Sequence, residues 1–174
     1  MPETVPIGSL LQRLTGNHRA RPWRNSDASE LVAAWNDPEI IRWNGVPPDP
    51  SLAFAERWIA GTATQHIRSP HVDVVVANQQ DRVEGELGLQ LDHATSRAEV
   101  GFWVAAHARR AGVGMELLEL AHQLLRALEI KQGFAITASD NAGAIALLQR
   151  TEWPEVATTT SDRRAFLLQP ELTA

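Results

Sequence analysis

The spacing of apolar residues along the chain changes from a helical to a strand-like period. One stripe at helical spacing predicts an amphipathic helix over residues 115–128. Its members are Leu117, Leu120, Ala121, Leu124 and Leu128. Capping residues and further apolar positions predict other helices from 27 to about 35, from 38, from 49 to about 65, and over 142–150.

β-branched and alternating segments predict strands between these helices. The predicted strands are 18–23, 72–77, 82–91, 97–104, 134–139, 156–160 and 164–169. Gly85 and Gly88 lie inside one of them, which indicates a bulge or a close approach of backbones. Helices come first, then an antiparallel meander, then strand–helix–strand–helix–strand. This order predicts an α/β protein with a mixed sheet.

The length of 174 residues suits one domain. Residues 1–17 are predicted to be a loosely attached N-terminal arm with one short apolar turn at Leu10, Leu11 and Leu14. Residues 18–170 are predicted to form a single domain.

Composition removes several kinds of chemistry. The chain has no Cys and no Tyr, but six Trp. The missing Cys excludes disulfides, zinc ribbons and a cysteine nucleophile, and the missing Tyr excludes a phenol as general acid. A net charge of −5 disfavours nucleic acid as the main partner, since phosphate binding needs a clustered basic face.

Other sequence signals point to a protein of the cytoplasm that needs no metal. No apolar run approaches the ~20 residues of a membrane helix, and the N-terminus does not resemble a signal peptide. The six His show no helix-spaced pair, so we expect no metal site. We read Trp35, Trp58 and Trp153 as packing residues.

The segment with the most distinct chemistry is the one that follows the strand at 97–104. A short loop there leads to Arg109-Arg110-Ala111-Gly112-Val113-Gly114, which opens directly into the long helix. The first N–H groups of a helix have no internal partner, and the macrodipole adds positive charge there. Gly112 and Gly114 let an anion approach the backbone closely. This pattern predicts a phosphate-binding site, although the glycines alone could form a turn and the arginines could be a solvated pair.

Two common phosphate motifs do not fit this loop. A P-loop needs Gly-Lys-Ser/Thr after four intervening residues, and a dinucleotide fingerprint needs a third Gly where Leu117 stands. The remaining option is a pyrophosphate loop of the form Arg/Gln-x-x-Gly-x-Gly/Ala.

In this and other motifs the chain resembles the GNAT superfamily of acyl-CoA N-acyltransferases, and within it the RimJ/RimL-like N-acetyltransferases. Arg109-x-x-Gly112-x-Gly114 resembles the acetyl-CoA loop, and Glu99-Val100-Gly101-Phe102-Trp103 resembles the family's Glu-Ile-Gly-Tyr-Trp strand. The likeness covers roughly residues 19–169. The motifs that extend it are Arg21-Pro22-Trp23, Asp37-Pro38-Glu39, Ile40-Ile41-Arg42-Trp43, Glu116 and Asn141-x-x-Ala144.

The resemblance implies a mostly antiparallel central sheet that is splayed between two strands, with flanking helices. It also implies that acetyl-CoA is the acyl donor. Its pyrophosphate is expected on the N–H groups of Arg110, Ala111, Gly112, Val113 and Gly114, beside Arg109. Its pantetheine arm is expected along Trp103 and Val104, with Asn141 in contact, although Asn141 could equally be a helix cap. The acceptor is expected near Trp23, Trp43 and the loop that starts at Asn44.

The resemblance further implies direct attack of an amine on the thioester. Glu99 is the expected base, because it shares a strand face with Gly101 and Trp103, although strand carboxylates also form structural ion pairs. Leu148 and Ala144 stand where relatives have a Tyr or a Ser that protonates the thiolate. Ser139, another group, water or the substrate ammonium would supply that proton instead.

The function expected from the sequence is therefore acetyl transfer from acetyl-CoA to a primary amine, on a small molecule or a protein N-terminus. The alternative is a non-catalytic acyl-CoA binder or sensor of the same fold, because both acid positions lack an acid. Many relatives are dimers, which leaves a homodimer open.

Overall fold

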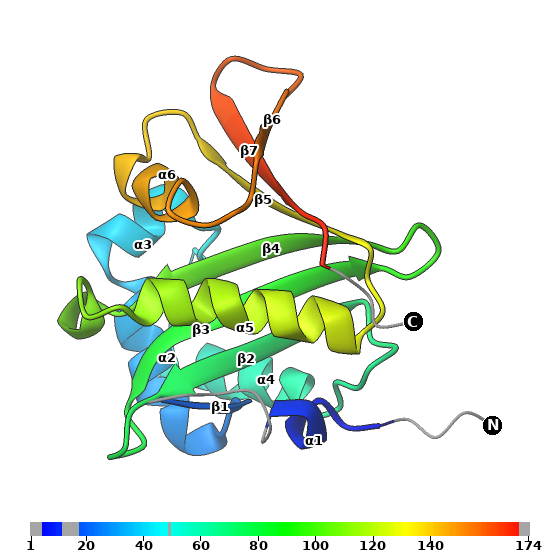
Figure 1. The fold of residues 1–174 in the computed structure, drawn as a ribbon. Helices are drawn as coiled ribbons and strands as arrows, with labels where there is room; N and C mark the ends of the chain where they lie inside the picture. Colours follow the sequence, from blue (N-terminus) through cyan, green and yellow to red (C-terminus); the bar gives the residue numbers. More distant parts are fainter. Residues whose placement is uncertain (1–4, 12–17, 49, 171–174) are drawn as a thin grey trace.

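The computed structural model describes residues 5–11, 18–48 and 50–170, in which one seven-stranded sheet forms the centre. The strands are β1 (Arg19–Pro22), β2 (His71–Ala77), β3 (Val83–Asp92), β4 (Arg97–Val104), β5 (Gln132–Ala138), β6 (Glu155–Val156) and β7 (Arg163–Leu168). Their order in the sheet is β1-β2-β3-β4-β5-β7-β6, and every neighbouring pair is antiparallel except β4–β5 (Figure 1). The mixed, mostly antiparallel sheet predicted from the sequence is confirmed.

Helices cover both faces of this sheet. They are α1 (Ile7–Leu11), α2 (Ala28–Trp35), α3 (Pro38–Trp43), α4 (Leu52–Thr62), α5 (Val113–Ala127) and α6 (Ala142–Leu148), with short 3₁₀ turns η1 (Asn25–Asp27) and η2 (Ala106–Ala108). The long helix α5 crosses one face of β2, β3 and β4, while α2 and α4 lie behind the opposite face (Figure 1).

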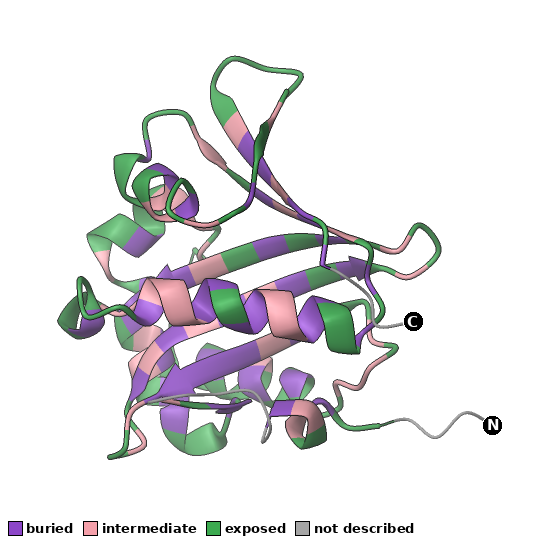
Figure 2. Cartoon of the chain, viewed as in Figure 1, coloured by how far each residue is buried: buried purple, intermediate pink, exposed green. Residues whose placement is uncertain are grey.

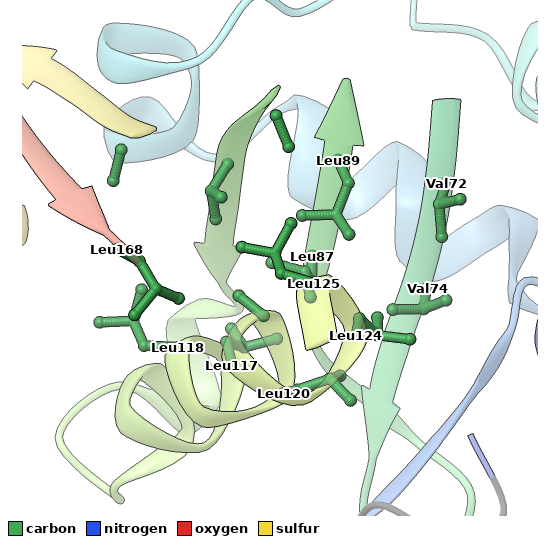
Figure 3. Packing of buried hydrophobic residues seen from close by; sticks show 14 of the residues in the cluster. Val72, Val74, Leu87, Leu89, Leu117, Leu118, Leu120, Leu124, Leu125 and Leu168 are labelled. Carbon is green, nitrogen blue, oxygen red and sulfur yellow. The ribbon is translucent and has the colours of Figure 1, made fainter. Parts of the chain in front are cut away.

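The main core lies between α5 and the sheet. The predicted stripe of α5 is buried against the residues of β2 and β3 that face it (Figure 3). These contacts include Val72, Val74, Leu87, Leu89, Leu117, Leu120 and Leu124. The solvent side of α5 is exposed, as its alternating colours show (Figure 2). A helix of this length needs such an apolar face, because intrinsic propensity alone gives only marginal helices.

A second core, rich in tryptophan, fills the opposite face beneath α2 and α4. Trp23 meets Trp58 edge-on with ring centroids 5.9 Å apart, and Trp58 meets Trp35 edge-on at 6.0 Å. Edge-to-face contact suits the quadrupoles of aromatic rings. Trp103 of β4 joins the same cluster at 6.3 Å from Trp23.

The pairing between β4 and β5 is short. Only Arg97, Ala98 and Glu99 pair with Gln132, Gly133 and Phe134. Beyond these residues β4 runs on to Val104 and β5 to Ala138 without pairing to each other, and the two strands diverge (Figure 1). The splay predicted between the two strands is therefore present.

A bulge interrupts the pairing of β2 and β3 at the position where the sequence predicted one. The register shifts between Val76 and Ala77, which pair with Gly85 and Val83. A Cβ on Gly85 would lie 2.8 Å from the carbonyl oxygen of Trp103 and 2.9 Å from Leu117. Only glycine allows this close approach of β3 to β4 and α5.

Some boundaries differ from the prediction for local reasons. Helix α4 begins after Ser51, because the Ser51 hydroxyl accepts a hydrogen bond from the N–H of Phe54 at 3.3 Å, whereas the expected start at Asp49 lies outside the described residues. Strand β6 ends at Val156, because the hydroxyl of Thr158 donates to the carbonyls of Thr160 and Arg163 and turns the chain there.

The N-terminal segment packs more closely than predicted. Ile7 and Leu11 of α1 are buried in the main core. The described part of the segment is therefore not loosely attached, and α1 lies beside β1 at the edge of the sheet (Figure 1). Leu14 lies outside the described residues.

Arg21 ties β1 to the start of α2. Its side chain is 7% exposed and forms a two-pronged ion pair with Asp27 at 2.7 and 3.0 Å. The other N–H groups donate to the carbonyl of Pro22, to the Asp81 carboxylate at 2.9 Å and to the Asp81 carbonyl. A guanidinium has five N–H donors, and all five are used here. Asp27 also accepts the N–H of Arg24, which fixes η1.

Candidate functional site

The N-terminus of α5 is open to ligands. Gly112 has φ +93°, in the left-handed region, and no side chain caps the helix. Among the described residues, no hydrogen bond uses the N–H groups of Gly112, Val113 or Gly114. Arg110 also has a positive φ of 64°, so two left-handed residues help to aim successive N–H groups outward. Free backbone donors at the positive end of a helix dipole are the features that the predicted anion site requires.

A cavity of about 690 Å³ extends from this helix end toward the diverging ends of β4 and β5. Phe102, Trp103 and Val104 form its wall on the β4 side, and α6 with the loop before it forms the opposite wall. Arg110 and Arg150 add positive charge to its lining. We call this the larger cavity.

Arg109 holds the loop before α5 against α3. Its Nη2 donates to the carboxylate of Asp37 at 2.7 Å, and its Nε donates to the carbonyl of Val104 at 3.3 Å. Asp37 also caps α3 by accepting the N–H groups of Glu39 and Ile40. Burial would raise the pKa of Asp37, but the hydrogen bond from Arg109 and those two backbone bonds lower it. Arg109 therefore positions the loop in this structure.

Asn141 caps α6, one of the two readings left open by the sequence. Its Oδ1 accepts the N–H of Ala144 at 3.2 Å, and its Nδ2 donates to the hydroxyl of Thr137 at 3.0 Å. Asn141 also lines the larger cavity. Near the cavity, an ion pair at 3.4 Å joins Arg42 of α3 to Asp140 of the loop before α6.

The structure gathers most, but not all, of the predicted site residues around the larger cavity. The lining includes Trp43, Asn44, Trp103, Val104, Arg109, Arg110, Gly112, Gly114 and Asn141. The predicted residues outside the lining are Trp23, Glu99, Ala111, Val113 and Ser139.

Those five lie apart for identifiable reasons. Val113 points into the main core, and Trp23 is 4% exposed within the tryptophan core. Ala111 and Ser139 are exposed, and the N–H of Ser139 is bonded to the carbonyl of Asp162. Glu99 is exposed on β4, four residues before Trp103, which at ~3.3 Å per residue places it about 13 Å along the strand.

A second cavity, of about 350 Å³, adjoins the first on the α2–α4 face of the sheet. It shares four lining residues with the larger cavity: Ile40, Asn44, Phe102 and Trp103. Its remaining lining comes from aromatic side chains, glycines, Pro47 and two carboxylates, Asp73 and Glu86. We call this the smaller cavity.

Glu86 is held by two indoles. Trp23 Nε1 donates to one carboxylate oxygen at 2.9 Å, and Trp103 Nε1 donates to the other. Burial, together with the charge of nearby Asp73, raises the pKa of Glu86 to about 7, although the two indole hydrogen bonds act in the opposite direction. Burial likewise raises the pKa of Asp73, against the hydrogen bond from Gln65 and the charge of His71.

This pKa has a consequence for stability. The folded-state pKa of Glu86 lies above its usual 4.5, so its contribution to stability is fully present below about pH 4.5 and is lost as the pH rises through about 7. Glu86→Gln cannot ionise and should not show this loss. In urea titrations between about pH 4.5 and pH 7, the free energy of unfolding of the variant should rise relative to that of the wild type as the pH increases. A constant difference would contradict the raised pKa.

The sequence reading missed Glu86 and Asp73. The alternation of β3 places Glu86 on the face away from α5, but its bonding partners lie 63 and 17 residues away along the chain. Trp35 and Trp58 were read as packing residues; they do pack, and they also line the smaller cavity.

No helix in the described ranges is both long and apolar enough to cross a bilayer. Within the same ranges, no three or more His, Cys, Asp or Glu side chains are grouped as a metal site would require.

Comparison with known proteins gives one family. The family model described as an acetyltransferase (GNAT) domain matches residues 19–152. No curated protein sequence matches the chain.

Several solved structures share the fold at low sequence identity. A spermidine N-acetyltransferase from Vibrio cholerae, in complex with CoA and spermine, has a TM-score of 0.78 at 15% identity, over 90% of this chain and 97% of its own. RimJ from Mycobacterium smegmatis, in complex with CoA-disulfide, has a TM-score of 0.75 at 15% identity, over 87% of this chain and 81% of its own. The microcin C7 self-immunity acetyltransferase MccE, in complex with acetyl-CoA and AMP, has a TM-score of 0.73 at 14% identity, over 90% of this chain and 94% of its own.

Proposed function

The chain belongs to the acetyltransferase (GNAT) domain family, and from this we propose that it transfers an acetyl group from acetyl-CoA to a primary amine. The N-terminal motifs further suggest the RimJ/RimL-like group within that family. The observation that supports the proposal most is the open N-terminus of α5, which faces a cavity that runs to the splay between β4 and β5.

The residues at this cavity suit an acyl-CoA. The N–H groups of Gly112, Val113 and Gly114 would hold the pyrophosphate, and a ligand can come close to Gly112 because nothing lies within 4 Å of the position of a Cβ there. Arg110 and Arg150 would add charge. Near Trp103 and Val104, β4 has no strand partner on its β5 side, and the backbone groups that face this side are available for a pantetheine arm.

The N–H of Val104 would polarise the thioester carbonyl, as an oxyanion donor does. Leu148 is 1% exposed and packs in the main core, while Ala144 lines the larger cavity. Neither position offers an acid for the thiolate. The alternative function, a non-catalytic acyl-CoA binder, rests on this point.

Binding and turnover can be tested separately. A ligand at a hundred times its dissociation constant should stabilise the fold by about 2.7 kcal/mol, seen as a rise in melting temperature with CoA and acetyl-CoA. Turnover should appear as thiol release with a panel of primary amines. The chain has no cysteine, so a thiol reagent detects only free CoA.

The outcomes are distinct. A thermal shift with thiol release supports the transferase. A shift without release from any amine would support the binder, and no shift at millimolar cofactor would rule out both.

A further inference from the structure

The smaller cavity exists because one row of the sheet has almost no side chains. Asp73 of β2 pairs with Gly88 of β3, and Gly88 pairs with Gly101 of β4. On the same face of the sheet, the next row consists of Val75, Glu86 and Trp103. Two adjacent glycines therefore leave a hollow between the sheet and the helices, with Asp73 at one end and Glu86 beside it as a diagonal neighbour.

The walls of this hollow are aromatic and its charge is negative. Trp35, Phe54, Trp58, Phe102 and Trp103 contribute aromatic side chains. Among the described residues, no Lys, Arg or His belongs to the lining, and the two carboxylates are the only ionisable groups there. Aromatic faces and carboxylates both attract an organic cation.

Both carboxylates keep room for another donor. Asp73 Oδ2 accepts Gln65 at 2.7 Å, whereas no hydrogen bond among the described residues reaches its Oδ1. Each oxygen of Glu86 accepts one indole N–H, and a carboxylate has about four acceptor positions. The indoles of Trp23 and Trp103 thus fix the orientation of Glu86 without using up its capacity.

We propose that the smaller cavity binds the acceptor as a small arylalkyl- or alkylammonium, whose nitrogen lies at Asp73 and Glu86, and that Glu86 takes its proton. The inference rests on the proposed function and adds the acceptor class and the base. The shared wall of Phe102 and Trp103 puts this nitrogen next to the splay, where the thioester is expected.

The protons balance in this scheme. The Glu86 carboxylate accepts one proton from the ammonium, and the free amine forms the C–N bond as the C–S bond breaks. The second proton of the nitrogen goes to the CoA thiolate, and Glu86 releases its proton to solvent. A carboxylate with a pKa near the working pH suits this task. No side-chain acid is needed, which fits Leu148 and Ala144.

A pair of substrates tests the charge of the cavity. Phenethylamine and phenylalanine carry the same aromatic body and amine, but phenylalanine adds a carboxylate that would face Asp73 and Glu86. We expect kcat/KM for phenethylamine to be at least about a hundredfold higher, which corresponds to about 2.8 kcal/mol at about 1.4 kcal/mol per tenfold. Equal values, or a preference for phenylalanine, would overturn the acceptor class.

A space-filling variant tests the location. A Cβ on Gly101 would meet only the carbonyl oxygen of Gly88, at 4.0 Å, so Gly101→Val can fill the hollow without a backbone clash. We expect kcat/KM for phenethylamine to fall at least about a hundredfold while the dissociation constant of CoA stays within about twofold. Gly61→Ala, in open space on α4, is the control and should change neither. Unchanged kinetics in a folded Gly101→Val would place the acceptor elsewhere.

Two isosteric variants identify the base. Glu86→Gln should lower kcat for phenethylamine at least about a hundredfold and remove the pH dependence of kcat near 7, with CoA binding retained. Glu99→Gln is the competing variant, because Glu99 lies on the neighbouring strand β4, on the same face of the sheet as Glu86. Loss of activity in Glu99→Gln alone, with Glu86→Gln active, would assign the base to Glu99. These variants are compared only once wild-type transfer is seen, so a failure of the proposed function is recognised first.

Discussion

Replacing Arg21 with methionine is expected to lower the free energy of unfolding by about 3–5 kcal/mol. The variant keeps the unbranched apolar stem of the side chain but leaves the buried Asp27 carboxylate without its two-pronged partner, at 2.7 and 3.0 Å. It also removes the link from β1 to Asp81. Since whole domains are stable by only about 5–15 kcal/mol, this is a large share. Urea denaturation at pH 7 would measure it.

Arg24 provides a matched control. It contacts the same Asp81 carboxylate, but its side chain is 53% exposed. An exposed ion pair contributes about 0–1 kcal/mol, so Arg24→Met should cost no more than that. Similar losses in the two variants would mean that burial of the Arg21 pair does not set its value. Arg21→Lys should recover only part of the loss, because an ammonium cannot form the fork.

Gly112→Val is expected to raise the dissociation constant of CoA by about a hundredfold. A β-branched residue at φ +93° is strained, and the loop would have to move to relieve the strain. The new side chain would also occupy the open space in front of the N–H groups of α5. About 2.7 kcal/mol of lost binding corresponds to the hundredfold change.

The measurement is a titration of CoA against tryptophan fluorescence, since Trp43 and Trp103 line the larger cavity. Gly61→Ala should bind CoA like the wild type and gain up to about 1 kcal/mol of stability, because alanine is the better helix former. If Gly112→Val is folded and binds CoA normally, the phosphate does not lie on this helix end.

Much of the fold follows from local sequence. Strand β4 begins and ends as predicted, at Arg97 and Val104, because its alternation is regular and a turn over residues 93–96 precedes it. The stripe of α5 is equally clear, since five residues share one helical face. Strand β6 was predicted too long, because the hydroxyl bonds that turn the chain at Thr158 depend on the tertiary position of β7.

The candidate site also contains parts that local sequence predicts and parts that depend on tertiary contacts. The loop at Arg109–Gly114 is contiguous, so its spacing could be read directly. Arg109 itself has a partner, Asp37, that lies 72 residues away, and no local pattern indicates that pair. Glu86 and Glu99 lie on one face of adjacent strands. Only the register shows that Glu86, opposite Trp103, lies beside the open part of the splay, whereas Glu99 lies where β4 still pairs with β5.

The short seam between β4 and β5 bears on how the molecule comes apart. Three pairs of residues join the segment from Gln132 to Leu168 to the rest of the sheet. Backbone units joined so narrowly can open locally at less free energy than global unfolding requires. A ligand strand lying in the splay would bridge the two parts. Cofactor affinity and the rigidity of the C-terminal segment are then two expressions of one linked equilibrium, so a substitution that loosens this segment weakens binding without touching the ligand.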